Sequence, residues 1–400
     1  MSNVQQPKSA STVFLDQPPS CLEFCPQAPD HFVIGTYLLS ETKNAHDEIQ
    51  QTKTGSVQLW KLDPDTSSLS LVQKVSLPYA VFDLHFHPRD TDKFAIASST
   101  GCISLFSVDR ATPSIHQLWT KSVHEDPSVP ALFFAWTPPK WLSSEKADGF
   151  AVTFSDGRTS VYGTTKDIME PDSITEWGTF DARQMIEVWF VALLAMSTST
   201  DTESATQSIP YMFTGNDFGS LHTRRFEVQD GDAHQDTQEQ PAVNLLLEHD
   251  DRARHHTAGV TAILPLPVPS VDDAPIILTG SYDESLRVYH ATRRGEVLAE
   301  QGLGGGVWRL QLLSCQELET NHTMLVLASC MHAGTRLVRV TRVQQQDGPE
   351  DWTIEILAEF TEHESMNYAS DTWKGTASSD VLCVSSSFYD RRVCVWRASV

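Results

Sequence analysis

The sequence predicts an all-β fold, a β-propeller of seven blades, from three observations. A unit of short apolar strand, turn signal and alternating strand recurs seven times along the 400 residues. A further apolar run, fit for a fully buried strand, stands ahead of the hairpin in each copy. No long helical periodicity competes with these strands, because the apolar stretch at 186–194 is rich in aromatic and β-branched residues, which favour a strand.

Each recurring hairpin joins a Gly or Asp turn to residues that alternate between apolar and polar, the pattern of antiparallel strands linked by a tight turn. The seven copies lie at 54–60, 99–106, 155–162, 216–221, 281–289, 332–337 and 388–396. Buried runs precede them, for example at 94–97, 150–154, 276–279 and 324–328. One blade cannot bury both faces of its sheet until neighbours stack on it, so the copies imply a closed ring.

We expect residues 1–400 to form one propeller domain, since all-β architectures often use this length in one unit. The copies are unevenly spaced because their loops differ in length. Three segments are expected to be mobile insertions: 41–54, the Ser/Thr-rich 196–208, and 228–254, which is rich in Asp, Gln and Glu.

The composition indicates a soluble protein that does not bind nucleic acid. Its formal charge is −23, with 52 acidic against 29 basic side chains, which argues against phosphate neutralisation and favours a cationic partner or simply solubility. The seven cysteines are dispersed, as in a reduced cytosolic protein. Cys21 and Cys25 have no second pair at zinc-finger spacing, so no metal site is expected.

Residues 1–20 lack the apolar core of a secretory signal, and no eighteen apolar residues run together. We therefore expect a cytoplasmic monomer that has no contact with membranes.

Standard catalytic signatures are absent. The sequence has no G-x-S-x-G elbow, H-E-x-x-H motif or P-loop. It also has no glycine-rich nucleotide loop joined to a helix, which argues against a methyltransferase or other cofactor enzyme, and no cofactor is expected. A propeller without such motifs is typical of an interaction platform, so a non-catalytic scaffold is one reading of the chain.

Two hairpins resemble a known repeat. Residues 278–289 and 386–396 resemble the strand, Asp turn and aromatic strand of the WD-repeat family. In that family a His, a Ser or Thr, the turn Asp and an aromatic residue form a hydrogen-bond network inside the blade. This pattern is matched by His256, Ser281 and Asp283, with Tyr289 where Trp is usual.

Longer blocks resemble one WD-repeat family in particular, the diphthine methyl ester hydrolases. The blocks are 21–26 with 35–37, 256–260, 279–284, 305–309 and 328–334, and weaker matches are 186–190 and His363 with Tyr368, Asp371 and Trp373. The resemblance implies a carboxylic-ester hydrolase that removes a methyl ester from the modified histidine of translation elongation factor 2. This step precedes the final amidation of diphthamide biosynthesis, and elongation factor 2 is then the expected partner.

The substrate implied by this resemblance carries a trimethylammonium group beside the ester. Aromatic faces and nearby carboxylates bind such a quaternary cation well. The candidate substrate-binding residues, all at blade turns or loops, are Tyr282, Glu284, Trp308, Trp373 and Tyr389.

Ester hydrolysis needs a base and donors that stabilise the tetrahedral oxyanion. His332 is the first candidate base, because it stands where a WD repeat normally places Asp. His363, oriented by Asp371, is the second. Cys330 or Ser329 could instead attack with His332 as its base, although a thiol beside an apolar strand also fits a buried core residue.

Overall fold

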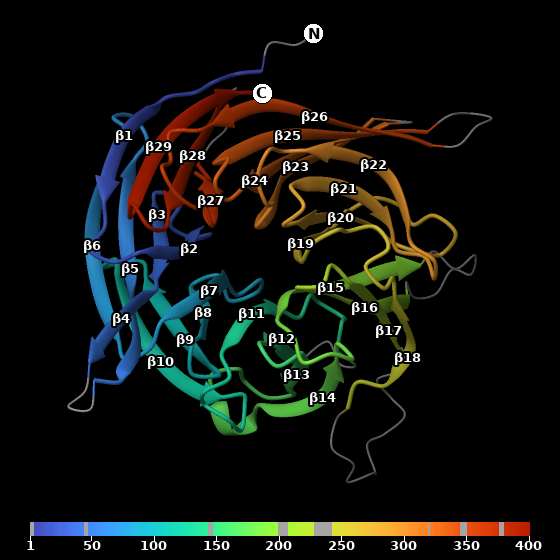
Figure 1. Cartoon of the computed structure of the whole chain (residues 1–400), viewed down its shortest axis with the longest axis horizontal. Helices are drawn as coiled ribbons and strands as arrows, with labels where there is room; N and C mark the ends of the chain where they lie inside the picture. The colour runs from blue at the N-terminus through green and yellow to red at the C-terminus, as the bar shows by residue number, and fades with distance from the viewer. Residues whose placement is uncertain are drawn as a thin grey trace.

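The computed structural model describes residues 4–43, 47–142, 147–198, 207–227, 242–318, 321–344, 350–375 and 380–400. These residues form seven antiparallel sheets, arranged as a ring around a central axis (Figure 1). The first strand of each sheet contacts the first strands of the sheets on both sides, so these strands enclose the centre. The prediction of an all-β propeller with seven blades is confirmed.

The strands of the first four blades, given from the centre outward, are the following. Blade 1 has β2 (Pro19–Phe24), β3 (His31–Thr36), β5 (Ile49–Asp63) and β6 (Ser68–Leu77), and β4 (Leu38–Lys43) pairs with the first part of β5. Blade 2 has β7 (Val81–Phe86), β8 (Lys93–Ser98), β9 (Cys102–Asp109) and β10 (Ser114–Ser122). Blade 3 has β11 (Ala131–Trp136), β12 (Asp148–Phe154), β13 (Arg158–Thr164), the 3-10 turn η1 (Pro171–Ser173) and β14 (Thr175–Asp181). Blade 4 has β15 (Val188–Thr198), β16 (Gln207–Asn216), β17 (Leu221–Phe226) and β18 (Leu245–Asp250).

The last three blades follow the same order. Blade 5 has β19 (Val260–Pro265), β20 (Ile276–Ser281), β21 (Ser285–His290) and β22 (Glu296–Gly302). Blade 6 has β23 (Arg309–Leu318), β24 (Asn321–Ser329), β25 (Thr335–Val343) and β26 (Asp351–Phe360). Blade 7 has β27 (Ala369–Thr372), β28 (Asp380–Ser387), β29 (Arg392–Ser399) and, from the other end of the chain, β1 (Ser9–Phe14).

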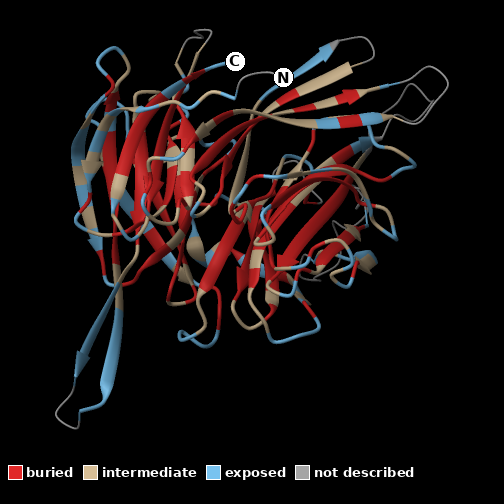
Figure 2. Ribbon diagram, turned by 45° about the horizontal axis from the view of Figure 1, so that its top comes forward, coloured by how far each residue is buried: buried red, intermediate tan, exposed pale blue. Residues whose placement is uncertain are grey.

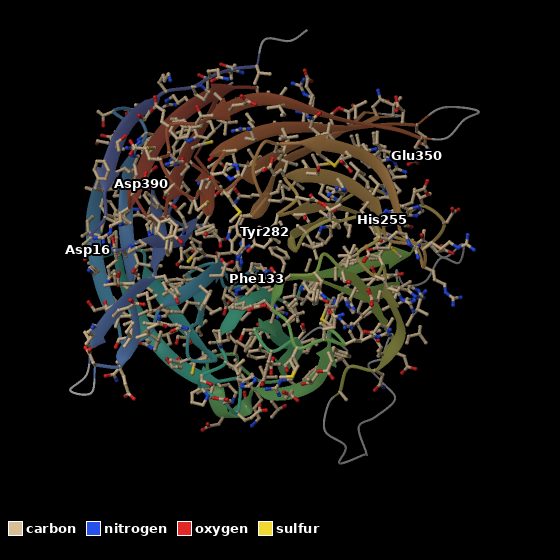
Figure 3. The ribbon with its side chains drawn as sticks, viewed as in Figure 1. Asp16, Phe133, His255, Tyr282, Glu350 and Asp390 are labelled. Atoms are coloured by element: carbon tan, nitrogen blue, oxygen red, sulfur yellow. The ribbon has the colours of Figure 1, made fainter. Side chains whose placement is uncertain are left out.

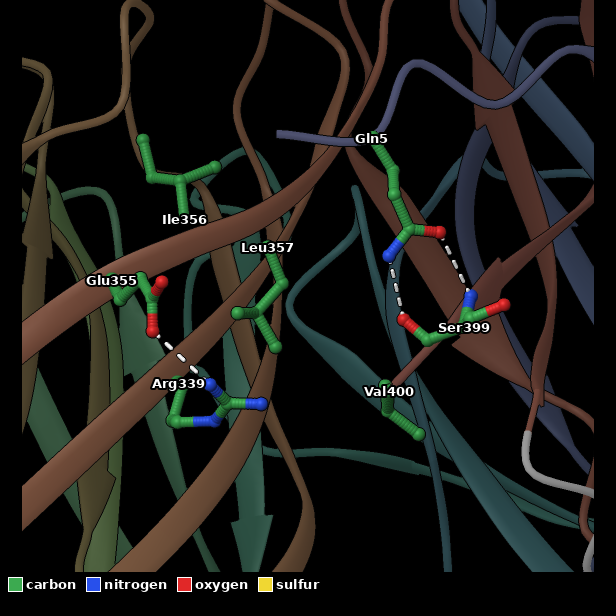
Figure 4. Close-up of a pocket in the computed structure, with 7 residues that line it drawn as sticks. All are labelled: Gln5, Arg339, Glu355, Ile356, Leu357, Ser399 and Val400. Atoms are coloured by element: carbon green, nitrogen blue, oxygen red, sulfur yellow. Dashed lines mark hydrogen bonds and ion pairs between the residues drawn. The ribbon is translucent and has the colours of Figure 1, made fainter. Parts of the chain in front are cut away.

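The ring is closed by the two ends of the chain. Strand β1 pairs antiparallel with β29 and completes blade 7. The side chain of Gln5 donates to the Ser399 carbonyl (2.7 Å) and accepts from the Ser399 N–H (3.0 Å), beside a pocket of about 300 Å³ that also contains the Arg339–Glu355 ion pair (Figure 4). No local sequence pattern predicts this closure, because it joins residues nearly the whole chain apart.

The hydrophobic core lies between neighbouring blades and within the inner strands of each, which are buried in Figure 2. All residues of β20 and β21 are buried, for example. Neighbouring blades approach closely enough to require glycine: a Cβ at Gly280 would lie 2.5 Å from the Val307 side chain of the next blade. Close packing of this kind fixes the inner strands that carry the site.

The three expected insertions contain more strand than predicted. Within 41–54, the described residues belong to the exposed hairpin of β4 and β5 that projects from blade 1 (Figure 2). The segment 228–254 contains β18, the edge strand of blade 4, and the ends of 196–208 belong to β15 and β16. Residues 44–46, 199–206 and 228–241 lie outside the described residues, and the mobility of the three segments and the 1–400 domain range stay predictions.

Candidate functional site

A pocket of about 560 Å³ lies where the first strands of the blades begin, at one mouth of the central opening. Figure 3 shows Tyr282, one of its lining residues, near the centre of the ring. The pocket wall is mostly aromatic: its rings are Tyr37, Phe82, Trp189, Tyr282, Trp308, Tyr368, Phe388 and Tyr389.

Four of these rings belong to residues at, or just before, the start of the innermost strand of their blades. Phe82 and Trp189 are the extra residues of β-bulges at the start of β7 and β15, where the pairing register shifts. A bulge turns one side chain away from the pairing pattern of the sheet. Trp308 and Tyr368 directly precede β23 and β27. Blades 2, 4, 6 and 7 therefore each supply one ring from the same place in the blade.

The rings contact one another in sequence around the pocket. Trp308 is central to the wall, with ring centroids 5.6 Å from Trp189, 6.0 Å from Tyr282 and 5.0 Å from Tyr368. Tyr368 in turn lies 5.4 Å from Phe388. These spacings and the tilted ring planes are those of favourable aromatic pairs. The wall is thus one connected aromatic surface that blades far apart in sequence build together.

The two sides of the pocket differ in charge. Behind Trp189, the indole N–H donates to Asp217 Oδ1 (2.7 Å), and this carboxylate makes the indole more electron-rich. Burial, followed by the nearby Asp217, raises the pKa of Tyr282 above its ordinary value, so its hydroxyl stays protonated. Among the described residues that line the pocket, Arg391 is the one with a charged side chain.

Below the pocket a charged cluster crosses the channel. Arg309 of β23 donates through Nε to Asp83 Oδ2 of β7 (2.9 Å), and its Nη2 contacts the same oxygen. The guanidinium also lies over the ring of Trp308 (4.7 Å to the centroid) and over that of Phe133 (4.8 Å). Phe133 lines a second pocket of about 340 Å³, so the Arg309 guanidinium contacts a ring of each pocket.

The cluster continues from Asp83 to His85 and Glu23. The two imidazole nitrogens of His85 lie 3.3 Å from Glu23 Oε2 and 3.6 Å from Asp83 Oδ1. Burial lowers the pKa of His85, but Asp83 and Glu23 outweigh it and the net pKa is raised. Burial also raises the pKa of Glu23. Blades 1, 2 and 6 are therefore linked across the channel by ionisable groups.

Three of the five predicted substrate-binding residues meet in the aromatic pocket: Tyr282, Trp308 and Tyr389. Glu284 does not line it, although it lies two residues from Tyr282. Trp373 follows the end of β27, at the opposite end of that strand from Tyr368, and its indole N–H donates to Asp30 (2.7 Å). Trp373 is thus a packing residue on the other side of blade 7.

Sequence reasoning missed five rings of the wall, namely Tyr37, Phe82, Trp189, Tyr368 and Phe388. One sequence signal could have identified two of them: a buried valine, at or just before the start of an inner strand, directly precedes the aromatic residue. This pair recurs as Val81–Phe82, Val188–Trp189 and Val307–Trp308.

His332 lies on the exposed turn between β24 and β25, and its Nε2 is 3.8 Å from Glu284 Oε1. The turn packs against the pocket wall: a Cβ at Gly306 would lie 2.6 Å from the sulfur of Met331 and 3.4 Å from Tyr282. The first candidate base therefore has a carboxylate neighbour and lies on a turn that packs beside Tyr282, outside the residues that line the pocket.

The structure does not join His363 to Asp371. His363 is buried, and its Nε2 lies 2.8 Å from Ser385 Oγ, which also accepts from the Trp396 indole N–H (3.0 Å). This is the WD-repeat network inside blade 7. Burial lowers the pKa of His363 to about 4. The buried Asp371 instead accepts from the Phe24 N–H (2.8 Å) across the blade 1 boundary, so both residues hold the fold together.

Cys330 is fully buried, with its sulfur 3.6 Å from the Ala328 carbonyl oxygen. Burial raises the pKa of the Cys330 thiol to about 12. A thiol that stays protonated and is closed off from water is a poor nucleophile, so the buried-core reading of Cys330 is favoured over a catalytic one.

In the blade 5 copy of the WD-repeat network, Arg287 joins the residues expected from the sequence. Its Nη1 lies 2.9 Å from His256 Nδ1 and donates to Asp283 (2.9 Å). Ser281 donates to the Ala258 carbonyl (2.9 Å). Arg287 thus supplies the hydrogen-bond partner in the network that the sequence comparison assigned to an aromatic residue, here Tyr289.

Within the described residues, no group of three or more His, Cys, Asp or Glu side chains is arranged to hold a metal ion. No helix in the described ranges is long and apolar enough to cross a membrane.

Solved structures similar to this chain confirm the fold. A chain of the mitotic checkpoint complex superposes with a TM-score of 0.57 at 11% identity, covering all of this chain and 94% of that one. Sqt1 of Saccharomyces cerevisiae superposes with a TM-score of 0.56 at 10% identity, with both chains fully covered. The prediction of a propeller fold agrees with these superpositions.

Curated proteins similar in sequence share one name. Diphthine methyltransferase of Schizosaccharomyces pombe is 25% identical over 386 residues, 96% of each chain. The diphthine methyltransferase homolog of Dictyostelium discoideum is 20% identical over 410 residues, 96% of this chain and 98% of its own. The human diphthine methyltransferase is 29% identical over 119 residues, 30% of this chain and 23% of that one. No protein-family model matches the chain. The chain is therefore a β-propeller that is similar, along nearly its whole length, to proteins named diphthine methyltransferase.

Proposed function

We propose that this protein acts in diphthamide biosynthesis as a carboxylic-ester hydrolase, removing the methyl ester from methylated diphthine on translation elongation factor 2 in the cytoplasm. One observation carries the proposal: an aromatic pocket at the central opening, in a chain whose full-length relatives are named for diphthine.

The pocket wall suits the trimethylammonium group of this substrate. A quaternary ammonium has no N–H to donate, so ring faces and nearby negative charge are what can bind it. Trp189 and Trp308 face the opening, and the Asp217 carboxylate behind Trp189 strengthens the negative face of its indole. The pocket volume of about 560 Å³ admits the modified side chain.

His332 with Glu284 is the base that the geometry favours. It is exposed to solvent on a turn beside the pocket wall, where water and a protein-borne ester can meet. In the proposed reaction, water attacks the ester carbonyl carbon and His332 takes a proton from it. The tetrahedral intermediate then expels methoxide, which takes that proton from His332 and leaves as methanol. The resulting carboxylic acid releases the second proton of the water to solvent and becomes a carboxylate.

The names of the relatives favour a second function, methyl transfer to diphthine, which the same pocket would also serve. The two reactions change the substrate mass in opposite directions, because transfer adds a methylene from a methyl donor and hydrolysis removes one. A non-catalytic scaffold would change nothing.

We expect the purified protein, without added cofactor, to lower the mass of elongation factor 2 carrying methyl-esterified diphthine by one methylene and to release methanol. His332→Ala should abolish this turnover at unchanged thermal stability, while the exposed His116→Ala should not affect it. The measurements are intact-protein mass spectrometry and methanol detection. An unchanged mass favours the scaffold, a gain of mass with a methyl donor favours the transferase, and turnover by His332→Ala removes this histidine from the mechanism.

Cys330→Ala should retain the hydrolysis rate within about twofold, because the buried, protonated thiol takes no part in attack. Rates of methanol release by the variant and the wild type test this. If the folded variant were inactive, Cys330 would return as the nucleophile.

A further inference from the structure

The wall of the aromatic pocket includes a positively charged side chain, which a pocket that binds only a cation would not be expected to have. Arg391 lines the pocket together with Tyr389 and Phe388, and the rest of the wall is aromatic, aliphatic or uncharged. Positive charge at such a wall disfavours a quaternary ammonium with no acceptor beside it, and favours one that also carries an ester or carboxylate oxygen to which a guanidinium can donate. The pocket composition therefore bears on what the ligand must look like.

Arg391 is held in place but retains free donors. Its Nη1 donates to the Asp16 carbonyl oxygen (2.8 Å), and its own carbonyl accepts from the Leu15 N–H (2.8 Å). No carboxylate of the described residues lies within ion-pair distance of its guanidinium. A guanidinium has five N–H groups, so donors beyond the one bonded to Asp16 remain for a ligand.

The backbone conformation at Arg391 is a second, independent observation that indicates a function for its side chain. In several blades the residue before the third strand has a left-handed backbone, and its carbonyl accepts the N–H of the residue after the outermost strand. This arrangement is found at Gly101 (φ 62°), Gly157 (φ 97°), Glu284 (φ 68°) and Arg391 (φ 56°).

Glycine adopts this conformation without strain, whereas a residue with a Cβ does not. Blades 2 and 3 use glycine at the turn, and blade 7 places an arginine there, beside the pocket. The left-handed backbone at Arg391 is strained, and glycine at this position would relieve the strain. An arginine kept at such a position indicates a function for its side chain.

We propose that Arg391 is the carboxyl-recognising residue of the pocket, which therefore takes a quaternary ammonium against the rings and an adjacent ester or carboxylate group against the guanidinium. For the identity of its natural ligand, this inference rests on the proposed function. It adds the group on the protein that recognises the ester or carboxylate end of that ligand. Arg391 holds the ester carbonyl of the substrate and the carboxylate of the product, and it binds the charged product more strongly because that hydrogen bond is charge-assisted.

Binding of two small probes tests this without any need for turnover. Glycine betaine carries both groups, and choline carries only the quaternary ammonium. Titration calorimetry should show that the wild type binds betaine at least about tenfold more tightly than choline. Arg391→Gly should remove that preference, chiefly by weakening betaine, and should not lower the melting temperature, because glycine suits the turn. Arg391→Lys should keep part of the preference.

The matched control is Arg252→Gly, which changes an exposed arginine with the same φ of 56° outside the pocket and should keep the betaine preference of the wild type. An equal preference in the wild type and Arg391→Gly would overturn the inference, as would the absence of saturable betaine binding to the wild type. If the preference depends on Arg391 while elongation factor 2 is not hydrolysed, the carboxyl recognition by Arg391 stands and the proposed reaction fails.

Discussion

Asp83→Ala should lower the free energy of unfolding by about 3–5 kcal/mol, because it leaves a guanidinium unpaired in the channel. Asp83 is almost fully buried and accepts from two nitrogens of Arg309, joining blade 2 to blade 6 across the ring. The remaining contacts of Arg309 are ring faces and backbone carbonyls, which do not neutralise its charge. Chemical denaturation followed by circular dichroism measures the loss.

A double variant separates the ion pair from simple packing. Asp83→Leu with Arg309→Met removes both charges and should recover most of the stability, since apolar residues of similar volume replace a buried pair with little cost. A loss below about 1 kcal/mol for Asp83→Ala would show instead that the pair behaves like an exposed surface ion pair.

Trp308→Leu should lower kcat/KM for ester hydrolysis by about 30-fold, the equivalent of about 2 kcal/mol for a desolvated cation–π contact. Trp308 contacts Trp189, Tyr282 and Tyr368, so it is the ring that the rest of the wall surrounds. Leucine keeps apolar bulk but has no π face. Steady-state rates of methanol release measure the effect.

Trp308→Phe retains a ring and should recover most of the activity. Phe218→Ala removes an exposed aromatic side chain that does not line the pocket and should leave kcat/KM unchanged. Wild-type kinetics in Trp308→Leu would mean that this wall does not hold the substrate.

The sequence could predict the number of blades because each blade repeats a local signal, a turn followed by alternating residues. It could not predict the closure by β1, since that strand pairs with β29 and no local pattern marks a partner so distant in sequence. Strand β18 was missed for a related reason: as an edge strand it has exposed residues, such as Leu245, and lacks the buried run that marks inner strands.

The candidate residues that line the pocket include two that stand on hairpin turns, a feature that sequence patterns can locate. Tyr282 and Tyr389 lie on turns of strongly patterned hairpins, and both line the pocket. Phe82 and Trp189 were missed because a bulge, which depends on the pairing of two strands, decides where they point. His363 was misassigned because a histidine in a blade network and a catalytic base look alike until their partners are known.

The central claim, that the ring wall recognises a quaternary cation through its charge, is tested most directly with two ligands of one shape. Glycine betaine and 3,3-dimethylbutanoate both carry a carboxylate and differ only in a positively charged nitrogen against a neutral carbon. Titration of the wild-type protein should show betaine binding about 30-fold more tightly. Equal affinity for the two ligands would contradict the claim.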